Sequence, residues 1–176
     1  MSVVTLAEAK EFCEVDFDSQ NTVIQILIDA AEEFVEKECG LDLEQDDYEE
    51  SVEGGGYALH PTHRPVASVD AVADAEADDE EVDEEEWRVD GDLIIRQDEA
   101  RWESGPNRYT LSYTGGYESV PAALKLLILG LVRRSYENRG GKSSQSAGGQ
   151  SVSWDELMAG DMGRVLAQFR RTGSVG

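Results

Sequence analysis

The two histidines are the residues of this 176-residue chain whose side chains best suit metal binding or proton transfer. They lie three residues apart in the segment His60-Pro61-Thr62-His63. A zinc site needs three or four ligands in a fixed geometry, and Cys13 and Cys39 are distant in the sequence. Prolines at positions 61 and 65 indicate an extended loop. We therefore expect two loop histidines, and we predict that the chain binds no metal and no cofactor.

Other patterns that could carry catalysis are weak. Gly140-Gly141-Lys142-Ser143 resembles the end of a phosphate-binding loop, but Tyr136 stands where that motif needs its first glycine. The motif also opens a helix after a strand, whereas here we expect a helix before it and a loop after it. Because both histidines lie in one short segment, no Ser/His/Asp arrangement stands out. The sequence therefore predicts a protein that is not an enzyme.

The excess of acidic side chains indicates the salt concentration to which the surface is suited. The chain has 38 acidic and 15 basic side chains, a net charge of -23, and only 4 of the basic residues are lysines. Such a surface repels itself in dilute salt, whereas at 1 M salt the screening length falls to about 3 Å. We interpret it as the surface of a halophilic protein, with a mesophilic protein that carries an acidic loop as the alternative. Loose binding to DNA or to anionic membranes is disfavoured.

The charge is divided unevenly along the chain. Residues 1–120 carry 34 acids and 7 bases, a net of -27, whereas residues 121–176 carry 8 bases and 4 acids, a net of +4. Arg133, Arg134 and Arg139 could pair with this chain's own acids or with those of a neighbouring copy. Alternatively, the positive segment docks onto another acidic protein or faces DNA. The sequence leaves both interpretations open.

Helices are expected at both ends of the chain, over residues 5–13, 19–39 and 121–138. Thr5-Leu6-Ala7-Glu8 forms a capping box for the first, and Gly40 suits a left-handed C-cap for the second. The apolar run Ala122–Val132 predicts burial on several sides of the third helix, and it is shorter than the ~20 residues of a membrane span. The predicted apolar face of the second helix consists of Val23, Leu27, Ala30, Ala31 and Phe34, widened by Ile24, Ile28 and Val35.

Residues 41–118 are expected to form a β-rich insert between these helices. Asp90-Gly91 is a candidate two-residue hairpin turn, and the acid-rich segment Asp78–Glu86 is expected to be a solvated loop or hairpin tip. The expected strands are short, alternating segments bounded by glycine and proline: Tyr57–Leu59, Pro65–Val72, Trp87–Val89, Leu93–Ile95 and Tyr109–Tyr113.

The remaining residues predict a separate C-terminal element. Residues 140–152 are rich in glycine and serine, which is typical of a flexible linker. The capping box Ser153-Trp154-Asp155-Glu156 then opens a helix over residues 153–171, an arm that is mobile or docked on a partner. The predicted fold class is α+β: a helical bundle of the two N-terminal helices and the helix from about residue 121, with a small β-rich insert. Residues 1–139 would form one domain.

The order of these segments resembles the head-tail connector (adaptor) proteins of tailed phages and tailed archaeal viruses. Val4–Lys10 is similar to the usual first helix of that family, and Val15–Asp18 followed by a helix ending at Cys39–Leu41 is similar to its second element. Leu59–Val69 resembles a proline-bounded strand of the family. The most specific stretch runs from Tyr109 to Lys125 and contains a strand, a glycine turn and a helix that begins at proline.

The resemblance implies a structural role in a virion, at the junction of head and tail, for a protein made in the host cytoplasm. The implied assembly is a ring of commonly twelve copies beneath the portal protein. The ring would extend the DNA channel without binding a DNA sequence and would dock the next neck or tail protein, with no membrane involved. The residues expected at the portal or subunit interface are Arg133, Arg134, Arg139, Trp154, Arg164, Phe169, Arg170 and Arg171.

Three alternatives remain at this point. The first is another neck component, such as a head-closure or tail-terminator protein, although the helices at both ends argue against the β-dominated structure expected of those proteins. The second is a halophilic cytosolic enzyme subunit, whose candidate pocket would be the loop of His60 and His63. The third is DNA binding by Arg133, Arg134, Arg164, Arg170 and Arg171.

Overall fold

The computed structural model describes residues 2–77, 79–138 and 161–170, and it confirms the predicted α+β class. The chain divides into two compact units. The helical unit comprises Met1–Cys39 and Ser119–Gly176, and the sheet unit comprises Gly40–Glu118. The predicted linker at residues 140–152 and the first part of the predicted helix at 153–171 lie outside the described residues.

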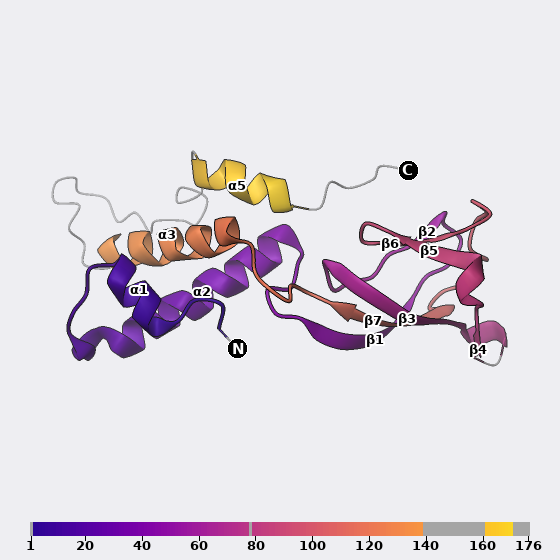
Figure 1. Cartoon of the computed structure of the whole chain (residues 1–176), viewed down its shortest axis with the longest axis horizontal. Coiled ribbons are helices and arrows are strands. Elements are labelled where there is room, and N and C mark those ends of the chain that lie inside the picture. Colours follow the sequence, from indigo (N-terminus) through magenta and orange to yellow (C-terminus); the bar gives the residue numbers. More distant parts are fainter. Residues whose placement is uncertain (1, 78, 139–160, 171–176) are drawn as a thin grey trace. The chain divides into compact units, whose positions relative to one another are not determined.

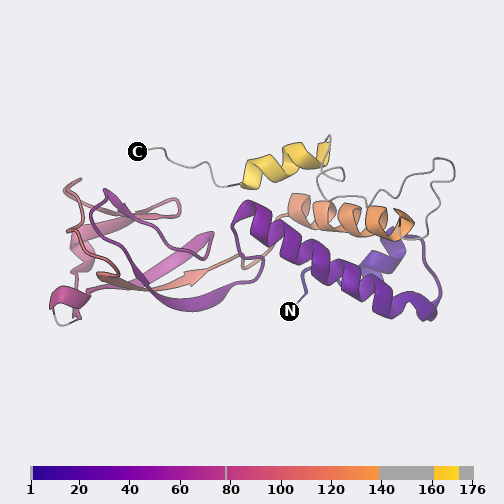
Figure 2. The same cartoon turned by 180° about the vertical axis from the view of Figure 1, so that it is seen from behind.

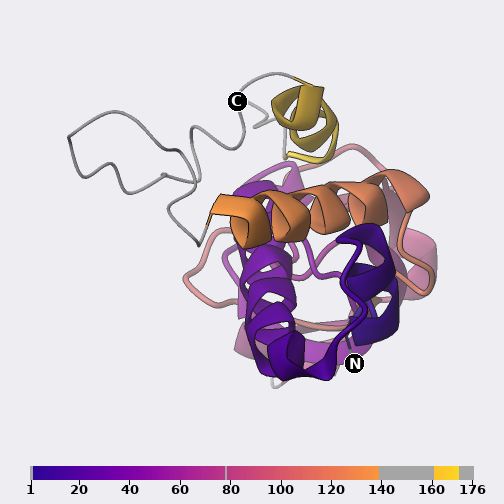
Figure 3. The ribbon, with the colours of Figure 1, turned by 90° about the vertical axis from the view of Figure 1, so that its left-hand side faces the viewer.

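The helical unit is built around two neighbouring helices. It contains α1 (Leu6–Phe12), α2 (Asn21–Cys39), α3 (Ala122–Asn138) and α5 (Asp161–Phe169), and a short 3-10 helix, η1 (Asp18–Gln20), leads into α2. Helices α1, α2 and α3 contact one another, and α5 contacts both α2 and α3. The first two views show α2 and α3 side by side from opposite directions (Figure 1, Figure 2). The end-on view shows α1 against this pair (Figure 3).

The predicted capping box at the start of α1 is confirmed, and it is tied to α3. The Thr5 hydroxyl accepts the backbone N–H of Glu8 at 3.2 Å, and the Glu8 carboxylate accepts the backbone N–H of Thr5 at 2.9 Å. The same carboxylate accepts a hydrogen bond from Lys125 Nζ of α3 at 2.6 Å. One side chain therefore both caps α1 and fixes it to α3.

The buried face of α2 is rotated from the predicted one. Ile24, Ile28 and Val35, which were predicted only to widen this face, lie at its centre. The residues predicted to form most of the face are half-buried at its margins: Val23, Leu27, Ala30 and Phe34. The reason is that α2 is covered from more than one side, by α1, α3 and α5. Gly40 follows with φ +61°, the left-handed conformation predicted for it. The fully buried stripe of α2 consists of Ile24, Ile28, Ala31, Val35 and Cys39.

Helix α3 contacts helices on several sides, as predicted, but its outward side is exposed. Leu126 is 59% exposed, and Ala122 and Ala123 are also exposed. Helices α1, α2 and α5 contact α3 but do not surround it, so an all-round apolar helix leaves apolar side chains in solvent. The buried residues are Leu124, Leu127, Ile128, Leu131 and Val132.

The described part of the predicted C-terminal arm packs on its own helical unit. Leu166 of α5 is 1% exposed, and its carbonyl oxygen accepts a hydrogen bond from Cys39 Sγ at 3.8 Å. A Cβ added at Gly130 of α3 would lie 2.4 Å from Met162, so α5 approaches α3 closely there. Arg170, just after α5, forms an ion pair with Glu38 of α2.

The sheet unit contains two antiparallel sheets. One has the strand order β1-β7-β3-β4 and the other β2-β6-β5. Strand β1 was not predicted, because four of its seven residues are acidic and low in strand propensity. Tyr48 of β1 is paired with Tyr113 of β7, and Val52 with Tyr109. The bounds are β1 Asp46–Val52, β2 Ala58–Leu59, β3 Val66–Asp74, β4 Glu80–Glu81, β5 Trp87–Asp90, β6 Leu93–Arg96 and β7 Tyr109–Gly115.

Side chains from both sheets share one core. Trp102, which lies between β6 and β7, is 1% exposed and donates its indole N–H to the carbonyl oxygen of Ile94 at 3.2 Å. Its ring meets Tyr109 edge-on, with centroids 4.9 Å apart. The remaining core residues are Val52, Leu59, Val72, Trp87, Leu111 and Tyr113.

The hairpin between β5 and β6 turns one residue later than predicted. Asp90 is still paired with Leu93 in the ladder, so the turn residues are Gly91 and Asp92. Asp92 is held by the sheet unit, since its carboxylate accepts the backbone N–H of Val66 at 3.0 Å and pairs with Arg64 at 3.3 Å. Those two contacts place Asp92, and not Asp90, in the turn.

Two glycines with positive φ angles allow a comparative test of close packing. A Cβ at Gly116 (φ +91°) would lie 2.1 Å from the Glu44 carbonyl oxygen, whereas a Cβ at Gly91 (φ +62°) has nothing within 4 Å. We expect Gly116→Ala to lower the free energy of unfolding by roughly 3 kcal/mol, from backbone strain and overpacking together. Gly91→Ala should cost about 1 kcal/mol, from strain alone. Denaturant unfolding followed by circular dichroism measures both, and equal losses would contradict the packing argument.

The contact between Glu8 and Lys125 makes a prediction about pH. The hydrogen bond from Lys125, followed by those from Thr5, lowers the pKa of Glu8 from 4.5 to about 2. Because the folded pKa lies below the unfolded value, this contribution to stability is complete above pH 4.5 and is lost as the pH falls toward 2. Carbon-detected NMR titration should give a Glu8 midpoint near 2, and Lys125→Met should move it toward 4.5. Lys10→Met is the control, because Lys10 pairs with Asp18 and not with Glu8.

Candidate functional site

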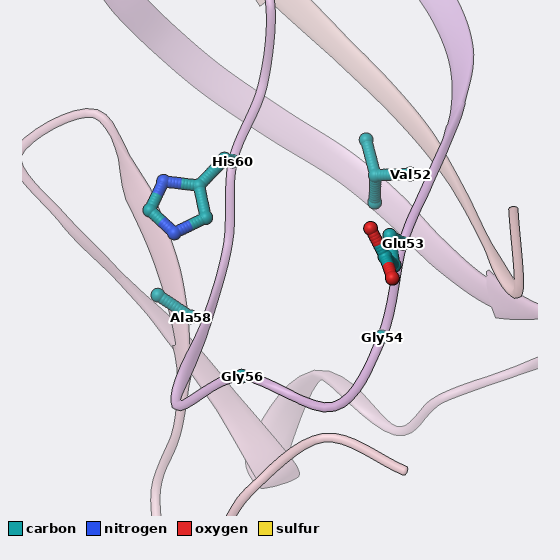
Figure 4. A pocket seen from close by; sticks show the side chains of 6 residues that line it. All are labelled: Val52, Glu53, Gly54, Gly56, Ala58 and His60. Carbon is teal, nitrogen blue, oxygen red and sulfur yellow. The ribbon is translucent and has the colours of Figure 1, made fainter. Parts of the chain in front are cut away.

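His60 lines a hollow in the sheet unit, and this hollow is the candidate pocket for the enzyme alternative. The hollow has a volume of about 390 Å³, and apart from His60 and Glu53 it is lined by Val52, Ala58 and two glycines. Figure 4 shows Glu53 on one arm of the chain and His60 on the other, with Gly56 near the bend between them. The lining offers an imidazole and a carboxylate, but no Ser, Thr, Cys or Lys side chain that could act as a nucleophile.

His63 has a structural environment of its own. Its ring stacks on Tyr48 with centroids 3.7 Å apart, and its Nδ1 lies 3.2 Å from the Asp42 carboxylate. Its backbone N–H donates to the Tyr113 hydroxyl at 3.0 Å, and that hydroxyl donates to Glu50 at 2.7 Å. Burial, followed by the neighbouring Glu50 carboxylate, raises the pKa of Tyr113. His63 therefore helps to join the loop before β3 to strands β1 and β7.

The structure does not combine the two histidines into a metal site. Within the described ranges, no group of three or more His, Cys, Asp or Glu side chains is placed to hold a metal ion. In the same part of the chain, no helix is long and apolar enough to cross a membrane.

Acidic side chains dominate a second hollow, of about 450 Å³, in the sheet unit. Beside it, Arg108 contacts Asp74 at 2.9 Å, Glu76 at 3.0 Å and Glu103 at 2.5 Å. The hydrogen bond to Asp74 raises the pKa of Arg108, and the same contact lowers the pKa of Asp74. This cluster fixes the end of β3 to the start of β7, while the acids from Glu80 to Glu86 remain exposed, as expected for the solvated segment.

Two of the predicted interface arginines are paired within this chain. Arg133 contacts Glu137 at 2.9 Å and Glu14 at 3.6 Å, and its guanidinium also donates to the carbonyl oxygen of Phe12 at 3.4 Å. Arg170 pairs with Glu38. For these two residues the structure therefore supports pairing with the chain's own acids.

The other predicted interface residues divide into two groups. Arg134 and Arg164 are exposed, and Phe169 is half-buried. Arg139, Trp154 and Arg171 lie outside the described residues.

Sequence reasoning missed the exposed apolar side chains of the helical unit. Ile26 of α2 is 60% exposed, Leu126 of α3 is 59% exposed, and Phe17 before η1 is 54% exposed. Ile26 falls two residues after Ile24 and opposite the buried stripe, a spacing that could have marked it as outward-facing. Apolar side chains that are exposed singly are common on protein surfaces, so these three do not by themselves mark a contact surface.

Comparison with known proteins identifies a family. The family model described as head completion protein matches residues 2–171. No curated protein gives a significant match.

The fold is also found in solved structures of gene transfer agent (GTA) particles. A chain in the neck of an empty GTA particle, computed with C6 symmetry, is 19% identical with a TM-score of 0.63; the match covers 99% of this chain and 92% of that one. A chain in the virion of a native GTA particle is 19% identical with a TM-score of 0.65 and the same coverage. A chain in the native GTA neck, computed with C12 symmetry, is 19% identical with a TM-score of 0.60, over 97% of this chain and 90% of that one.

The family match spans both units. The chain belongs to the head completion protein family, and it is a structural, non-enzymatic protein of a virion.

Proposed function

We propose that this protein is the adaptor of the neck, a ring of twelve copies beneath the portal protein that extends the DNA channel and docks the next neck or tail protein. The observation that carries the proposal is the match of the whole chain, both units included, to chains from GTA necks computed with C6 and C12 symmetry. Copies related by such symmetry form closed rings.

A head-closure protein is the alternative that the family description favours. The helices of this chain argue for the adaptor, since α1, α2, α3 and α5 make up one of its two compact units. A β-dominated protein would lack a helical unit of this size. The two candidates differ in the partner that they bind first, because the adaptor contacts the portal directly.

The charge of the protein suits a channel through which DNA passes without being held. Residues 1–120 have a net charge of -27, which repels phosphate groups. Arg133 and Arg170, which were candidates for DNA contact, pair with Glu137 and Glu38 of the same chain. We therefore expect DNA to move past the ring with no sequence-specific binding.

The same charge supports a source in a halophilic host, and we propose a tailed virus of haloarchaea. The acids of the segment Asp79–Glu86 are exposed, and the chain has 4 lysines against 11 arginines. Glu86 pairs with Arg96 at 3.1 Å, and exposed carboxylates that lack such a partner repel one another unless salt screens them.

Electron microscopy of the purified protein mixed with the portal protein tests the proposed ring. We expect closed rings of one size attached to the portal in molar salt. A head-closure protein would leave the portal bare and would bind only after another neck protein had been added. Failure to form rings or to bind the portal under these conditions would rule out the adaptor role.

The dependence of stability on salt tests the halophilic assignment. We expect the midpoint of thermal unfolding to rise steadily as KCl increases from 0.1 M toward 3 M, because screening of the acids stabilises the compact state. Thermal unfolding of a protein with a near-neutral surface in the same KCl series serves as the control, because it reports the effects of KCl other than screening of surplus acids. A midpoint that stays level above about 0.2 M KCl, where exposed charges are already largely screened in an ordinary protein, would contradict the assignment.

A further inference from the structure

The sheet unit has two outer faces, and the one formed by β6 and β5 carries large apolar side chains and a base. The two sheets form two layers with the shared core between them (Figure 1, Figure 2). Ile94 of β6 is buried in that core, so its neighbours Leu93 and Ile95 lie on the outer side, where both are partly exposed. Arg88 of β5 is paired with Ile95 and shares this side. We call Leu93, Ile95 and Arg88 the β6 face.

The outer face of the other sheet is built of small and acidic side chains. Leu111 and Tyr113 of β7 are buried in the core, so the residues between and beside them lie on the outer side. Asp70 is exposed next to this side, at the shift of register in β3. The β7 face consists of Thr110, Ser112 and Thr114 of β7, Ser68, Ala71 and Ala73 of β3, and Asp47, Glu49 and Ser51 of β1.

Arg88 has no acidic partner within the described residues, although the chain has 38 acids. It is exposed, and its guanidinium donates to the side-chain oxygen of Gln97 at 3.4 Å. In contrast, Arg96 of the neighbouring strand pairs with Glu86 and Asp98. A guanidinium has five N–H donors, so Arg88 can still bind a carboxylate of another molecule.

Contacts inside the chain show which strand of one sheet lies across the core from which strand of the other. Asp92, in the turn between β5 and β6, accepts the backbone N–H of Val66, and Val66 is paired with Gly115 at the end of β7. Trp87 of β5 donates its indole N–H to the carbonyl oxygen of Val82, next to β4. Strand β5 therefore lies on the side of β3 and β4, and β6 lies across from β7 with its turn near Gly115.

This order of strands is kept when copies are arranged in a ring. Twelve copies are related by rotations of about 30°. If the rotation axis lies in the plane of the sheets, the β6 face of one copy meets the β7 face of the next with strand order and direction unchanged. The leucine and isoleucine of β6 then lie over Thr114 and Ser112, and Arg88 lies over the bulge that contains Asp70. Large side chains meet small ones, and a base meets an acid.

We infer that the β6 face of one copy stacks on the β7 face of the next copy. This rests on the proposed ring of twelve. Because the two faces are opposite sides of one sandwich, their contact is head-to-tail, which is the kind that closes a ring. The fold is shared with neck chains in particles computed with C6 and C12 symmetry, which favours a second copy as the occupant. Strands of four residues are about 14 Å long, so this contact is one part of the interface between copies.

Cysteine crosslinking within the assembled ring tests the stacking. In the double variant Ile95→Cys/Ser112→Cys, a short bismaleimide should link each copy to both neighbours and give a ladder of covalent oligomers on a denaturing gel. The background carries Cys13→Ser, because Cys13 is half-buried, whereas Cys39 is buried. Within one copy the two new thiols point away from each other on sheets about 10 Å apart, so the reagent cannot join them there.

The control for this crosslink keeps two thiols and moves one of them. Ile95→Cys/Ser104→Cys places the second thiol at an exposed residue outside the β7 face, and this variant should remain monomeric on the gel. Rings in which Ile95→Cys/Ser112→Cys crosslinks no more than this control would overturn the inference.

Reversal of the two charges gives an independent measurement. Arg88→Glu and Asp70→Arg should each weaken ring assembly roughly tenfold in sedimentation velocity, and the double variant should restore it, because the pair is then reversed and still complementary. Arg101→Glu is the matched control, since Arg101 is exposed on the same unit and stacks on Tyr57, outside both faces.

Two outcomes separate failure of this contact from failure of the ring. Single variants that assemble as well as Arg101→Glu, or a double variant that assembles no better than the single ones, would refute the stacking and leave the ring intact. If the wild-type protein forms no ring even with the portal, the proposed function itself is wrong and this inference falls with it.

Discussion

The packing of α2 against α3 is the contact on which the helical unit depends. The buried stripe from Ile24 to Cys39 on α2 faces helices on more than one side, because α1, α3 and α5 all contact it. This arrangement fixes the rotation of each helix about its own axis, and so it also determines which residues face outward. Ile26 and Leu126 are exposed because Ile24 and Leu124 are buried. The outer surface of the unit is thus a consequence of its core.

Electrostatics acts on this framework locally. Basic side chains are few, and those that the structure describes in detail hold elements together: Lys125 joins α3 to α1, Arg108 joins the ends of β3 and β7, and Arg170 joins the end of α5 to α2. The surplus acids remain in solvent, above all in the segment that follows β3. A net charge of -23 therefore disfavours the compact state in general while a few paired charges specify its contacts.

Features set by residues adjacent in sequence could be predicted, whereas features set by contacts with distant parts of the chain could not. The capping box at Thr5 and the left-handed Gly40 involve residues adjacent in sequence, and the structure has both. The rotation of α2, the one-residue shift of the hairpin at Asp92 and the acidic strand β1 depend on contacts from elsewhere in the chain. The same holds for the candidate interface. Charge counting found Arg133 and Arg170 but could not show their partners, and a search for core residues passed over Ile26.

The acidic surface also limits how copies of the chain can associate. In a protein whose surface is mostly acidic, each copy repels the next, so association needs contacts that overcome this repulsion at a few defined points. Salt shortens the range of the repulsion and does not weaken apolar contacts. A ring of such copies would be held by a few defined contacts, with the repulsion of the remaining acids opposing any other contact between copies.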